Sequence, residues 1–314
     1  MMNSYEILKH YDKKYNYDLI LAYESGLSAH IGYLIKKKRD KKLILISHGN
    51  DILNKKLKVL TKLVLQEADK IIVRSNFMKN FVSSQYSLEA SKIFICPDGV
   101  ILKESDVQET KSELRIELKI DQREFIILSV GLLNLVRKGY DLILKSLKSL
   151  RDNYSLDINN IKYILIGRDN LKVRTWLKSL AKKYDLESNF EILVNLSNDL
   201  RNKYYKASDI FVMPSRDLKR EGSVEGFGNV FIEAGYFSLP SVGSNTGGIP
   251  DAIESEKSGF IVNNFDELVE KIKLLYENKS LRLKMGQFAH VRVLKTFLWD
   301  KIYKLYMKTF KSII

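Results

Sequence analysis

Short runs of apolar residues recur along the chain, and each run ends near a small or polar residue. Many of the apolar residues are β-branched, and the runs are too short to form complete helices. Continuous apolar runs of this length are typical of parallel strands that a sheet buries on both faces. The pattern predicts strands at Asp18–Tyr23, Leu43–Ser47, Lys70–Ser75, Lys92–Pro97, Phe125–Gly131, Lys162–Gly167, Phe190–Val194, Asp209–Pro214 and Gly259–Val262.

Longer stretches with helical spacing lie between these runs. Ile143, Leu147 and Leu150, for example, follow Gly139 at intervals of three or four residues. Strands that alternate with helices predict βαβ units and parallel sheets. The fold class is therefore α/β.

The stretch from Lys103 to Glu124 is polar and has no strand character. We therefore expect two α/β domains, residues 1–102 and 123–297, joined by a linker at 103–122. The chain after Phe297 is amphipathic, with apolar residues at helix-compatible positions: Trp299, Ile302, Leu305 and Phe310. A helix at 298–314 is expected to pack back onto the first domain.

Composition excludes several classes of protein. Hydrophobic residues make up 45% of the 314 residues and charged residues 29%, which is typical of a packed protein and not of a disordered one. The single cysteine, Cys96, excludes an internal disulfide, and we expect it to be a buried strand residue. The four histidines are scattered, so no zinc site is expected. Without signal-peptide character or a run of ~18 apolar residues, the chain is predicted to be cytoplasmic.

The formal charge of +14 is the one compositional outlier. It predicts attraction to an anionic partner, either phosphate groups, an anionic membrane surface or nucleic acid. Much of the positive charge comes from lysine, and the proteins that some genomes encode are generally rich in lysine. Both explanations stay open at this point.

The densest candidate site follows the strand that ends at Pro214, because ligands of parallel α/β sheets bind outside the carboxyl ends of strands. The segment Glu225-Gly-Phe-Gly-Asn-Val-Phe-Ile-Glu233 opens an apolar stretch that is predicted to be helical. Gly226 and Gly228 allow the backbone to approach a ligand closely, and a helix start offers N–H groups to a diphosphate. Glu233, inside the helix, and Glu225, before it, can accept hydrogen bonds from sugar hydroxyls. The alternative is that Glu225 only stabilises the helix start and Glu233 is solvated.

Three further strand ends carry candidate residues. Gly131 is followed by Arg137 and Lys138, which could neutralise a diphosphate or form an exposed basic loop. His48 follows a strand of the first domain, where it either contacts a ligand or is structural. The glycine pair in Thr246–Asp251 either lines the same cleft or turns the chain.

Several common motifs are absent from the sequence. It contains no G-x-x-x-x-G-K-[ST] and no G-x-G-x-x-G that opens a βαβ unit. It also lacks a G-x-S-x-G elbow. No D-x-D stands at a strand end, so an obligatory divalent metal is not expected.

Taken together, these segments resemble glycosyltransferase family 4, from about Asp18 to the carboxyl terminus. The family has the GT-B fold, with two Rossmann-like domains that contain parallel sheets. The resemblance is strongest over Ala207–Ser215, over the E-x7-E pattern from Glu225 to Glu233, and over Pro240–Val262.

The resemblance implies a retaining hexosyltransferase that uses a UDP-sugar or GDP-sugar as substrate, with no cofactor and no metal. Glu233 is similar to the glutamate that holds the ribose, and Val194 precedes the base-binding loop. The residues that match the family's catalytic positions are His48, Lys138 and Glu225. The residues expected to bind the donor are Gly131, Arg137, Lys138, Val194, Glu225, Gly226, Phe227, Gly228, Asn229 and Glu233.

The sequence departs from the family pattern in two places. Leu132 stands where the family usually has an arginine, and Arg137 could supply that charge from a different backbone position. The first domain is also short, since the strand and glycine-rich loop that normally open it are not recognisable. We therefore expect an abbreviated N-terminal domain.

The function expected from the resemblance is hexosyl transfer to a glycan or lipid-linked acceptor in polysaccharide or envelope glycan synthesis. The alternative is a degenerate, non-catalytic subunit that binds a nucleotide sugar and needs a partner subunit. No nucleic-acid partner is expected, because no RNA-recognition signature accompanies the charge.

Two basic segments of the first domain, Lys36–Arg39 and Asn54–Lys62, favour a peripheral contact with the inner face of the membrane. In and just after the second segment, the apolar residues Leu57, Leu60 and Val64 would suit such a contact. A solvated basic helix face explains the same pattern.

Overall fold

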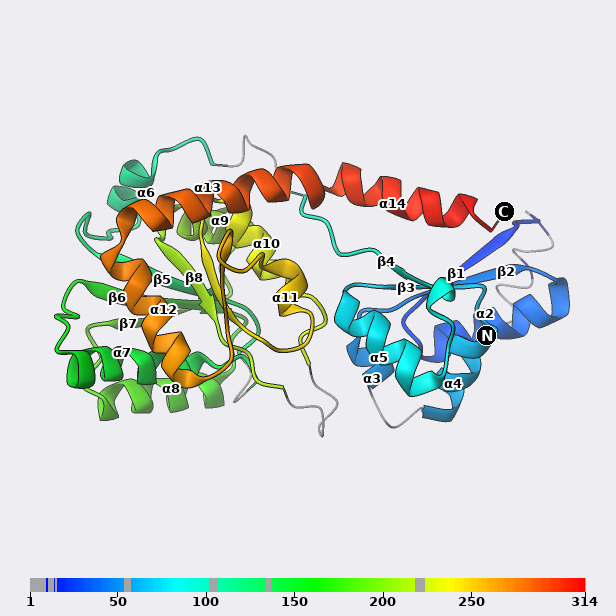
Figure 1. The fold of residues 1–314 in the computed structure, drawn as a ribbon, viewed down its shortest axis with the longest axis horizontal. Helices are drawn as coiled ribbons and strands as arrows, with labels where there is room; N and C mark the ends of the chain where they lie inside the picture. The colour runs from blue at the N-terminus through cyan, green and yellow to red at the C-terminus, as the bar shows by residue number, and fades with distance from the viewer. Residues whose placement is uncertain are drawn as a thin grey trace. The chain divides into compact units, whose positions relative to one another are not determined.

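The structure is a computed structural model that describes His10, Lys14 and residues 16–53, 58–101, 107–133, 137–217 and 224–313, without the side chains of Asn50 and Lys58. The chain forms two compact units, each built on its own parallel sheet (Figure 1). The described part of unit 1 ends at Gly99 and resumes at Val224–Phe227 and at α14. Unit 2 contains Val100–Asp217 and Gly228–Leu298.

Unit 1 is a four-stranded parallel sheet in the order β1-β2-β3-β4, with helices on both faces. Its strands are β1 (Leu19–Tyr23), β2 (Lys42–Ile46), β3 (Lys70–Val73) and β4 (Ile93–Ile95). Its helices are α2 (Leu27–Arg39), α3 (Asn50–Leu53), α4 (Lys58–Glu67), α5 (Asn76–Tyr86) and α14 (Trp299–Lys311), with a short 3₁₀ turn at Ala90–Lys92.

Strand β2 shows why both faces of this sheet must be covered. Leu43 and Leu45 enter the core with Ala29 of α2 and Val64 of α4. Ile44 and Ile46, one residue out of phase, enter a second core on the opposite face. Because side chains alternate across a strand, a continuous apolar run gives two apolar faces, and each face needs a covering layer.

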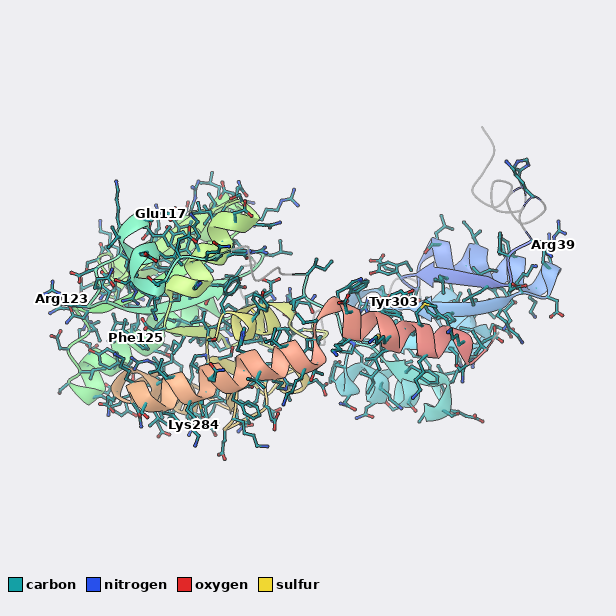
Figure 2. The ribbon with its side chains drawn as sticks, turned by 90° about the horizontal axis from the view of Figure 1, so that it is seen from above. Arg39, Glu117, Arg123, Phe125, Lys284 and Tyr303 are labelled. Atoms are coloured by element: carbon teal, nitrogen blue, oxygen red, sulfur yellow. The ribbon has the colours of Figure 1, made fainter. Side chains whose placement is uncertain are left out.

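Helix α14 supplies the covering layer of the second face. Ile302 is fully buried there with Ile44, Ile72 and Cys96, while Tyr303, on the same helix, is exposed (Figure 2). Cys96 is buried, as the sequence predicts, and burial raises the pKa of its thiol to about 12. The C-terminal helix is therefore part of the core of unit 1.

Unit 2 is a six-stranded parallel sheet in the order β10-β9-β8-β5-β6-β7. Its strands are β5 (Phe125–Val130), β6 (Ile161–Gly167), β7 (Phe190–Val194), β8 (Ile210–Met213), β9 (Ser241–Ser244) and β10 (Gly259–Val262). Its helices are α6 (Lys111–Glu117), α7 (Tyr140–Tyr154), α8 (Leu171–Lys183), α9 (Asn198–Ala207), α10 (Asn229–Tyr236), α11 (Ile249–Ala252), α12 (Phe265–Glu277) and α13 (Lys279–Thr296).

The main core of unit 2 lies between the sheet and helices α7, α8 and α12, with Leu147, Leu177 and Ile272 fully buried in it. Helix α10 packs against α13, and α9 packs against α6. All strand pairs are parallel, so the carboxyl ends of the strands meet at one edge of the sheet.

The α/β class with parallel sheets is confirmed, and each of the nine predicted strands forms with its ends within two residues of the prediction. The prediction missed β9, which reads Ser-Val-Gly-Ser and has only one apolar β-branched residue. Helix α6 lies inside the predicted 103–122 linker and belongs to unit 2. The predicted domain boundaries stay predictions.

Some residues of the two basic segments are held inside unit 1 and are not presented on a surface that a membrane could contact. Lys36 Nζ donates to Glu67 O at 2.8 Å and to Asp69 Oδ2 at 2.6 Å, so it is held within unit 1. Val64 is buried and wrongly predicted to face outward, whereas Leu60 is partly exposed. Residues 54–57 lie outside the described chain. No helix among the described residues is long and apolar enough to cross a membrane.

The burial of Ile302 predicts a large effect of its truncation. Ile302→Ala leaves a cavity between α14 and the sheet of unit 1 and is expected to lower the free energy of unfolding by about 2–4 kcal/mol. Leu305→Ala, on the same helix but 42% exposed, is the control and is expected to cost much less. Urea denaturation followed by circular dichroism measures both. Equal losses in the two variants would contradict the assigned packing face.

Candidate functional site

At the carboxyl edge of the sheet in unit 2, the loop after β5 lies directly against the end of β8. Gly139 has a φ of 69°, and a Cβ on it would stand 2.1 Å from the carbonyl oxygen of Pro214. The amide of Arg216 donates to Arg137 O at 2.7 Å. Only glycine permits this approach, and it fixes the start of α7 beside the end of β8.

A bidentate ion pair secures the same junction. The guanidinium of Arg216 donates to both carboxylate oxygens of Asp141, each at 2.7 Å. Asp141 lies in the first turn of α7, where a carboxylate also stabilises the helix dipole. Neither side chain is exposed by more than 28%.

Lys138 is buried and lies beside Gly131. Its side chain is so close that a Cβ on Gly131 would lie 3.7 Å from Lys138 Cε and 2.9 Å from Tyr140 Oη. A buried lysine at the carboxyl end of β5 can present its charge to an anionic ligand at this edge. The following residue, Leu132, is exposed, and its carbonyl oxygen accepts a hydrogen bond from Tyr140 at 3.1 Å.

The loop at Thr246–Asp251 belongs to the same edge. Thr246 Oγ1 and Ser244 Oγ both donate to the carbonyl oxygen of Ser215, at 3.1 and 2.5 Å. The hydroxyl of Ser215 is itself buried and has no hydrogen-bond partner among the described residues. The ends of β8 and β9 are therefore tied together around a hydroxyl that a ligand could use.

Helix α10 begins at Gly228, whose φ of 98° only glycine adopts readily. Asn229 is the first helical residue and Glu233 the fifth, so Glu233 lies inside the helix as predicted. The amides of the first turn, from Asn229 on, offer N–H groups at this end of the helix.

The carboxylate of Glu233 is enclosed by two side chains of α9. Tyr205 Oη donates to Glu233 Oε2 at 3.0 Å, and Arg201 Nη2 lies 3.9 Å from the same oxygen. Burial raises the pKa of Glu233, although Arg201 and Tyr205 both oppose the shift. The Nε of Arg201 is buried without a partner among the described residues. Glu233 is thus a charged group with unused hydrogen-bonding capacity near it, and not a solvated one.

Val194 ends β7 at the same edge of the sheet. The next residue, Asn195, has a φ of 55°, and its amide donates to Gly167 O at 2.9 Å. Its side-chain oxygen accepts from the amide of Asp169 at 3.1 Å. These bonds hold the loop after β7 in one backbone conformation.

In unit 1, the segment before α10 lies against the carboxyl ends of β2 and β3. Ser75 Oγ donates to Gly226 O at 2.6 Å, and a Cβ on Gly226 would lie 2.6 Å from His48 O. Val224 is buried in the core of this unit. The structure thus brings the glycine-rich segment and His48 together.

Asp51 organises the loop that carries His48. Its carboxylate accepts hydrogen bonds from Ser47 Oγ, from the amide of Gly49 and from the amide of Ser25, all at 2.8–2.9 Å. A carboxylate with three donors fixes the loop, so the role of Asp51 is structural.

The imidazole of His48 is partly exposed within a polar cluster. Its ring packs edge-on against Tyr23 at 4.8 Å between centroids. Its Nε2 lies 3.4 Å from Arg74 Nη2, and its Nδ1 lies 4.0 Å from Asp98 Oδ2. The cluster fixes the orientation of the ring at the end of β2.

Arg74 is the buried centre of this cluster. Its Nη1 lies 3.1 Å from Asp98 Oδ1 and donates to Cys96 O at 3.1 Å and to Tyr306 Oη of α14. Burial alone would lower the pKa of Arg74, but Asp98 and Tyr306 raise it overall. The guanidinium therefore stays charged and connects β3, the loop after β4 and α14.

The structure groups the predicted residues by unit. Unit 2 holds Gly131, Arg137, Lys138, Val194, Gly228, Asn229 and Glu233, and unit 1 holds His48, Glu225, Gly226 and Phe227. The division falls between Phe227 and Gly228, so the two glutamates of the motif belong to different units. Among the described residues, no group of three His, Cys, Asp or Glu side chains could hold a metal ion.

Sequence reasoning missed four residues that shape these clusters. Arg74 and Asp98 follow strand ends in the first domain, so the rule that led to His48 could have found them. Arg201 and Tyr205 lie one helical turn apart on α9, but nothing in the sequence links that helix to Glu233. Their role depends on tertiary packing.

Comparisons with known proteins identify the family of this chain. The family described as "Glycosyl transferases group 1" matches residues 110–292, and "Glycosyltransferase Family 4" matches residues 3–104. A GDP-mannose-dependent alpha-(1-6)-phosphatidylinositol monomannoside mannosyltransferase of Mycobacterium tuberculosis is 22% identical over 236 residues. The match covers 74% of this chain and 59% of the mannosyltransferase.

Solved structures share the fold. Sucrose-phosphate synthase from Thermosynechococcus elongatus superposes with a TM-score of 0.79 at 21% identity, over 98% of this chain and 77% of that one. The Anabaena protein HepE, in a complex with UDP, gives a TM-score of 0.81 at 20% identity, over 98% and 82%. The fold is therefore that of the GT-B glycosyltransferases. Since the first family description covers more than half of the residues, the chain belongs to the group 1 glycosyl transferases.

Proposed function

We propose that this chain is a retaining hexosyltransferase that takes its sugar from a nucleotide-diphosphate donor and needs no metal. The acceptor in this proposal is a glycan or a lipid-linked glycan of polysaccharide or envelope synthesis, at the inner face of the membrane. The observation that carries the proposal is the partly buried carboxylate of Glu233, which Tyr205 and Arg201 hold in α10, a helix that starts at a glycine in the left-handed region.

Glu233 is assigned to the ribose of the donor. Its Oε2 already accepts from Tyr205, and its burial makes an additional pair of hydroxyl donors favourable. A ribose offers two vicinal hydroxyls to one carboxylate, which matches this need. Val194 and the backbone after it are assigned to the base, because the fixed loop at Asn195 presents backbone atoms there.

The diphosphate is assigned to Lys138, Arg137, the glycine at 131 and the first amides of α10. When the bond to the sugar breaks, negative charge builds up on the departing diphosphate. A buried lysine and a helix N-terminus stabilise that charge without reorganising. Asn229, the first residue of α10, is part of this group.

The sugar is assigned to Glu225, Gly226 and Phe227, the motif residues before α10. Glu225 accepts hydrogen bonds from sugar hydroxyls, and the backbone of Gly226 and Phe227 approaches the sugar where no side chain intervenes. His48 stands beside Gly226, oriented by Tyr23, Arg74 and Asp98. Among these residues we assign catalysis to His48, Glu225 and Lys138.

The choice between UDP and GDP stays open in this proposal. The mycobacterial relative is named for GDP-mannose, and the structure of HepE contains UDP. Both nucleotides share the ribose and the diphosphate, which are the parts that Glu233 and Lys138 would bind.

One observation favours a second candidate, a non-catalytic partner subunit that binds the nucleotide sugar but does not turn it over. Leu132 is 54% exposed at the position after Gly131, where a cationic side chain would face the diphosphate. Loss of one such cation removes stabilisation of the leaving group while leaving the ribose site intact.

Turnover separates the two candidates. With UDP-hexoses or GDP-hexoses alone, the wild-type chain is expected to transfer the hexosyl group slowly to water and release the nucleoside diphosphate. Lys138→Met is expected to lower this rate by about 10²-fold. The control is Lys148→Met, which removes an exposed lysine of α7 that pairs with Asp152. Nucleotide release is followed by a coupled enzyme assay. Tight nucleotide binding without release, unchanged by Leu132→Arg, would favour the partner subunit.

The partial burial of Glu233 also predicts that its ionised carboxylate, which is assigned to ligand binding, lowers the stability of the folded protein. Its raised pKa means that the folded protein keeps this proton to a higher pH than the unfolded chain does. The resulting contribution to stability is complete below the ordinary pKa of glutamate and is lost as the pH rises through the raised, folded-state pKa. At neutral pH the ionised group therefore destabilises the ligand-free protein.

Glu233→Gln keeps an acceptor for Tyr205 and removes the buried charge. We expect it to raise Tm by about 1–4 °C at pH 7.5 and to have little effect at pH 4.5. Scanning calorimetry at both pH values provides the measurement, with exposed Glu270→Gln as the control. An equal rise in Tm at both pH values, or a lower Tm at pH 7.5, would show that the buried charge of Glu233 does not cause the change in stability.

A further inference from the structure

A cavity lies in unit 2 at the opposite edge of the sheet from the site described above. It opens at the amino ends of β5, β8 and β9, next to Phe125, Asp209 and Pro240. Its volume is about 860 Å³, within the range of about 300–1,000 Å³ that small-molecule sites occupy. Nothing in the proposed donor chemistry uses this edge.

The lining of the cavity is strongly cationic. Its carboxylates are Glu124 and Asp209. Its cationic residues outnumber them three to one: Lys111, Arg115, Arg123, Lys206, Lys279 and Arg282. Aromatic residues, among them Phe237 and Tyr276, form an apolar part of the wall. A basic cavity with an apolar wall fits an organic anion.

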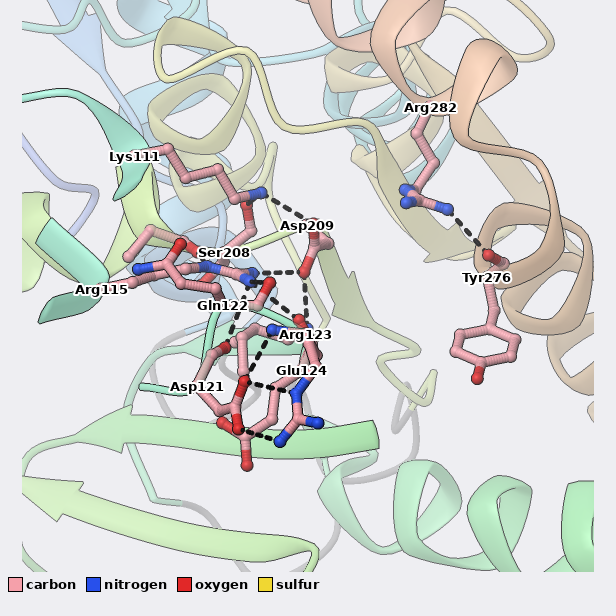
Figure 3. A network of polar contacts seen from close by, with 12 residues as sticks. Lys111, Arg115, Asp121, Gln122, Arg123, Glu124, Ser208, Asp209, Tyr276 and Arg282 are labelled. Carbon is pink, nitrogen blue, oxygen red and sulfur yellow. Dashed lines mark hydrogen bonds and ion pairs between the residues drawn. The ribbon is translucent and has the colours of Figure 1, made fainter. Parts of the chain in front are cut away.

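Internal contacts account for part of this charge. Asp209 accepts from Lys111 Nζ, from Arg115 Nη2 and from the amide of Ile126, each at 2.7 Å (Figure 3). Arg115 is buried, and its other donors reach the carbonyl oxygens of Ala207, Gln122 and Glu124. Arg115 and Asp209 therefore build the wall of the cavity and have little capacity left for a ligand.

Of the remaining cations, Arg123 pairs with Asp121 and Lys206 donates to Val107 O, whereas Arg282 is not balanced by a carboxylate in the same way. Arg282 Nη1 donates to the carbonyl oxygen of Tyr276 (Figure 3) and to that of Leu275. Its guanidinium lies 5.0 Å from the centre of the Phe125 ring. Within the described part of the chain, these contacts are with neutral groups. Lys279, one turn earlier on α13, is exposed at the rim.

The positive groups also repel one another. Burial lowers the pKa of Lys111, and Arg115 and Arg282 lower it further against the attraction of Asp209. Burial likewise lowers the pKa of Arg282, with Arg115 contributing. One carboxylate shared among three cations leaves an excess of positive charge that an anion would relieve.

We propose that this cavity is a second ligand site of unit 2, which binds a small phosphorylated molecule through Arg282, Lys279 and Lys111. The guanidinium of Arg282 offers a planar set of donors to phosphate oxygens, and the two lysines add charge from the neighbouring walls. Phe237 and Tyr276 contact the organic part of the ligand. The site is independent of the donor site and of the reaction proposed for it.

The probe for this site is inorganic pyrophosphate, titrated calorimetrically into the full chain with UDP or GDP present in excess to fill the donor site. Wild type is expected to bind one further pyrophosphate, more weakly as salt rises. Lys279→Glu is expected to weaken that binding at least about tenfold. Glutamate is favourable in the first turn of a helix, so this variant should fold normally.

The matched control is Lys284→Glu, which makes the same charge change on an exposed residue of α13 that does not line the cavity (Figure 2). It is expected to bind pyrophosphate as wild type does. Arg282→Gln is the second variant, with its folding checked by thermal unfolding, and it too should weaken binding. Equal weakening by Lys279→Glu and Lys284→Glu, or no binding by wild type, overturns the proposal. Neither result depends on whether the donor site turns over a sugar.

Discussion

The candidate site depends on two places where backbone lies directly against backbone. In unit 2, Gly139 lies so close to the carbonyl oxygen of Pro214 that no side chain fits between them. In unit 1, Gly226 stands in the same relation to the carbonyl oxygen of His48. Both contacts join a loop to the carboxyl end of a strand, and each brings a candidate functional residue with it, Lys138 in the first case and His48 in the second. A Cβ at either glycine would separate the strand end from the loop.

Around these contacts the two units use polar groups differently. Asp51 and Asp209 each accept hydrogen bonds from three donors, and Asp141 accepts a bidentate pair from Arg216, so these carboxylates fix loops and helix starts. Glu233 accepts a hydrogen bond from Tyr205, with Arg201 3.9 Å away, and burial raises its pKa. A carboxylate whose hydrogen bonds the fold only partly supplies lowers the stability of the protein by itself. It contributes binding free energy when hydroxyl groups of a ligand donate to it. The contrast separates structural from functional carboxylates better than their exposure does.

Much of this arrangement could be predicted from the sequence, because parallel strands leave a local signal. Runs such as Leu43–Ser47 must be apolar on both faces, and each such run became a strand. Strand β9 was not predicted, because Ser241 and Gly243 are small residues that do not form an apolar run, although both are buried in the structure. The motif from Glu225 to Glu233 could be located from its glycines and spacing. The contacts of Glu233 with Tyr205 and Arg201, and of His48 with Arg74, depend on how distant segments pack, so the sequence did not reveal them.

The basic charge of the chain has more than one explanation in the structure. Lys36 is held by Asp69, and Arg74 by Asp98. Lys138 is buried at one edge of the sheet in unit 2, and Arg282 and Lys279 lie at the other. The net charge of the chain therefore indicates an anionic partner only through those cations that are not already paired with carboxylates of the protein.

The central claim is that Glu233 holds the ribose of a nucleotide donor, and a ligand-and-protein cycle tests it most directly. The affinity of UDP, or of GDP if that is the one that binds, is compared with that of its 2′,3′-dideoxy analogue in wild type, Glu233→Ala and the exposed control Glu270→Ala. The account predicts that wild type and the control lose about 10–100-fold in affinity when the hydroxyls are removed, whereas Glu233→Ala binds both ligands equally weakly. The same loss in Glu233→Ala as in wild type would contradict it.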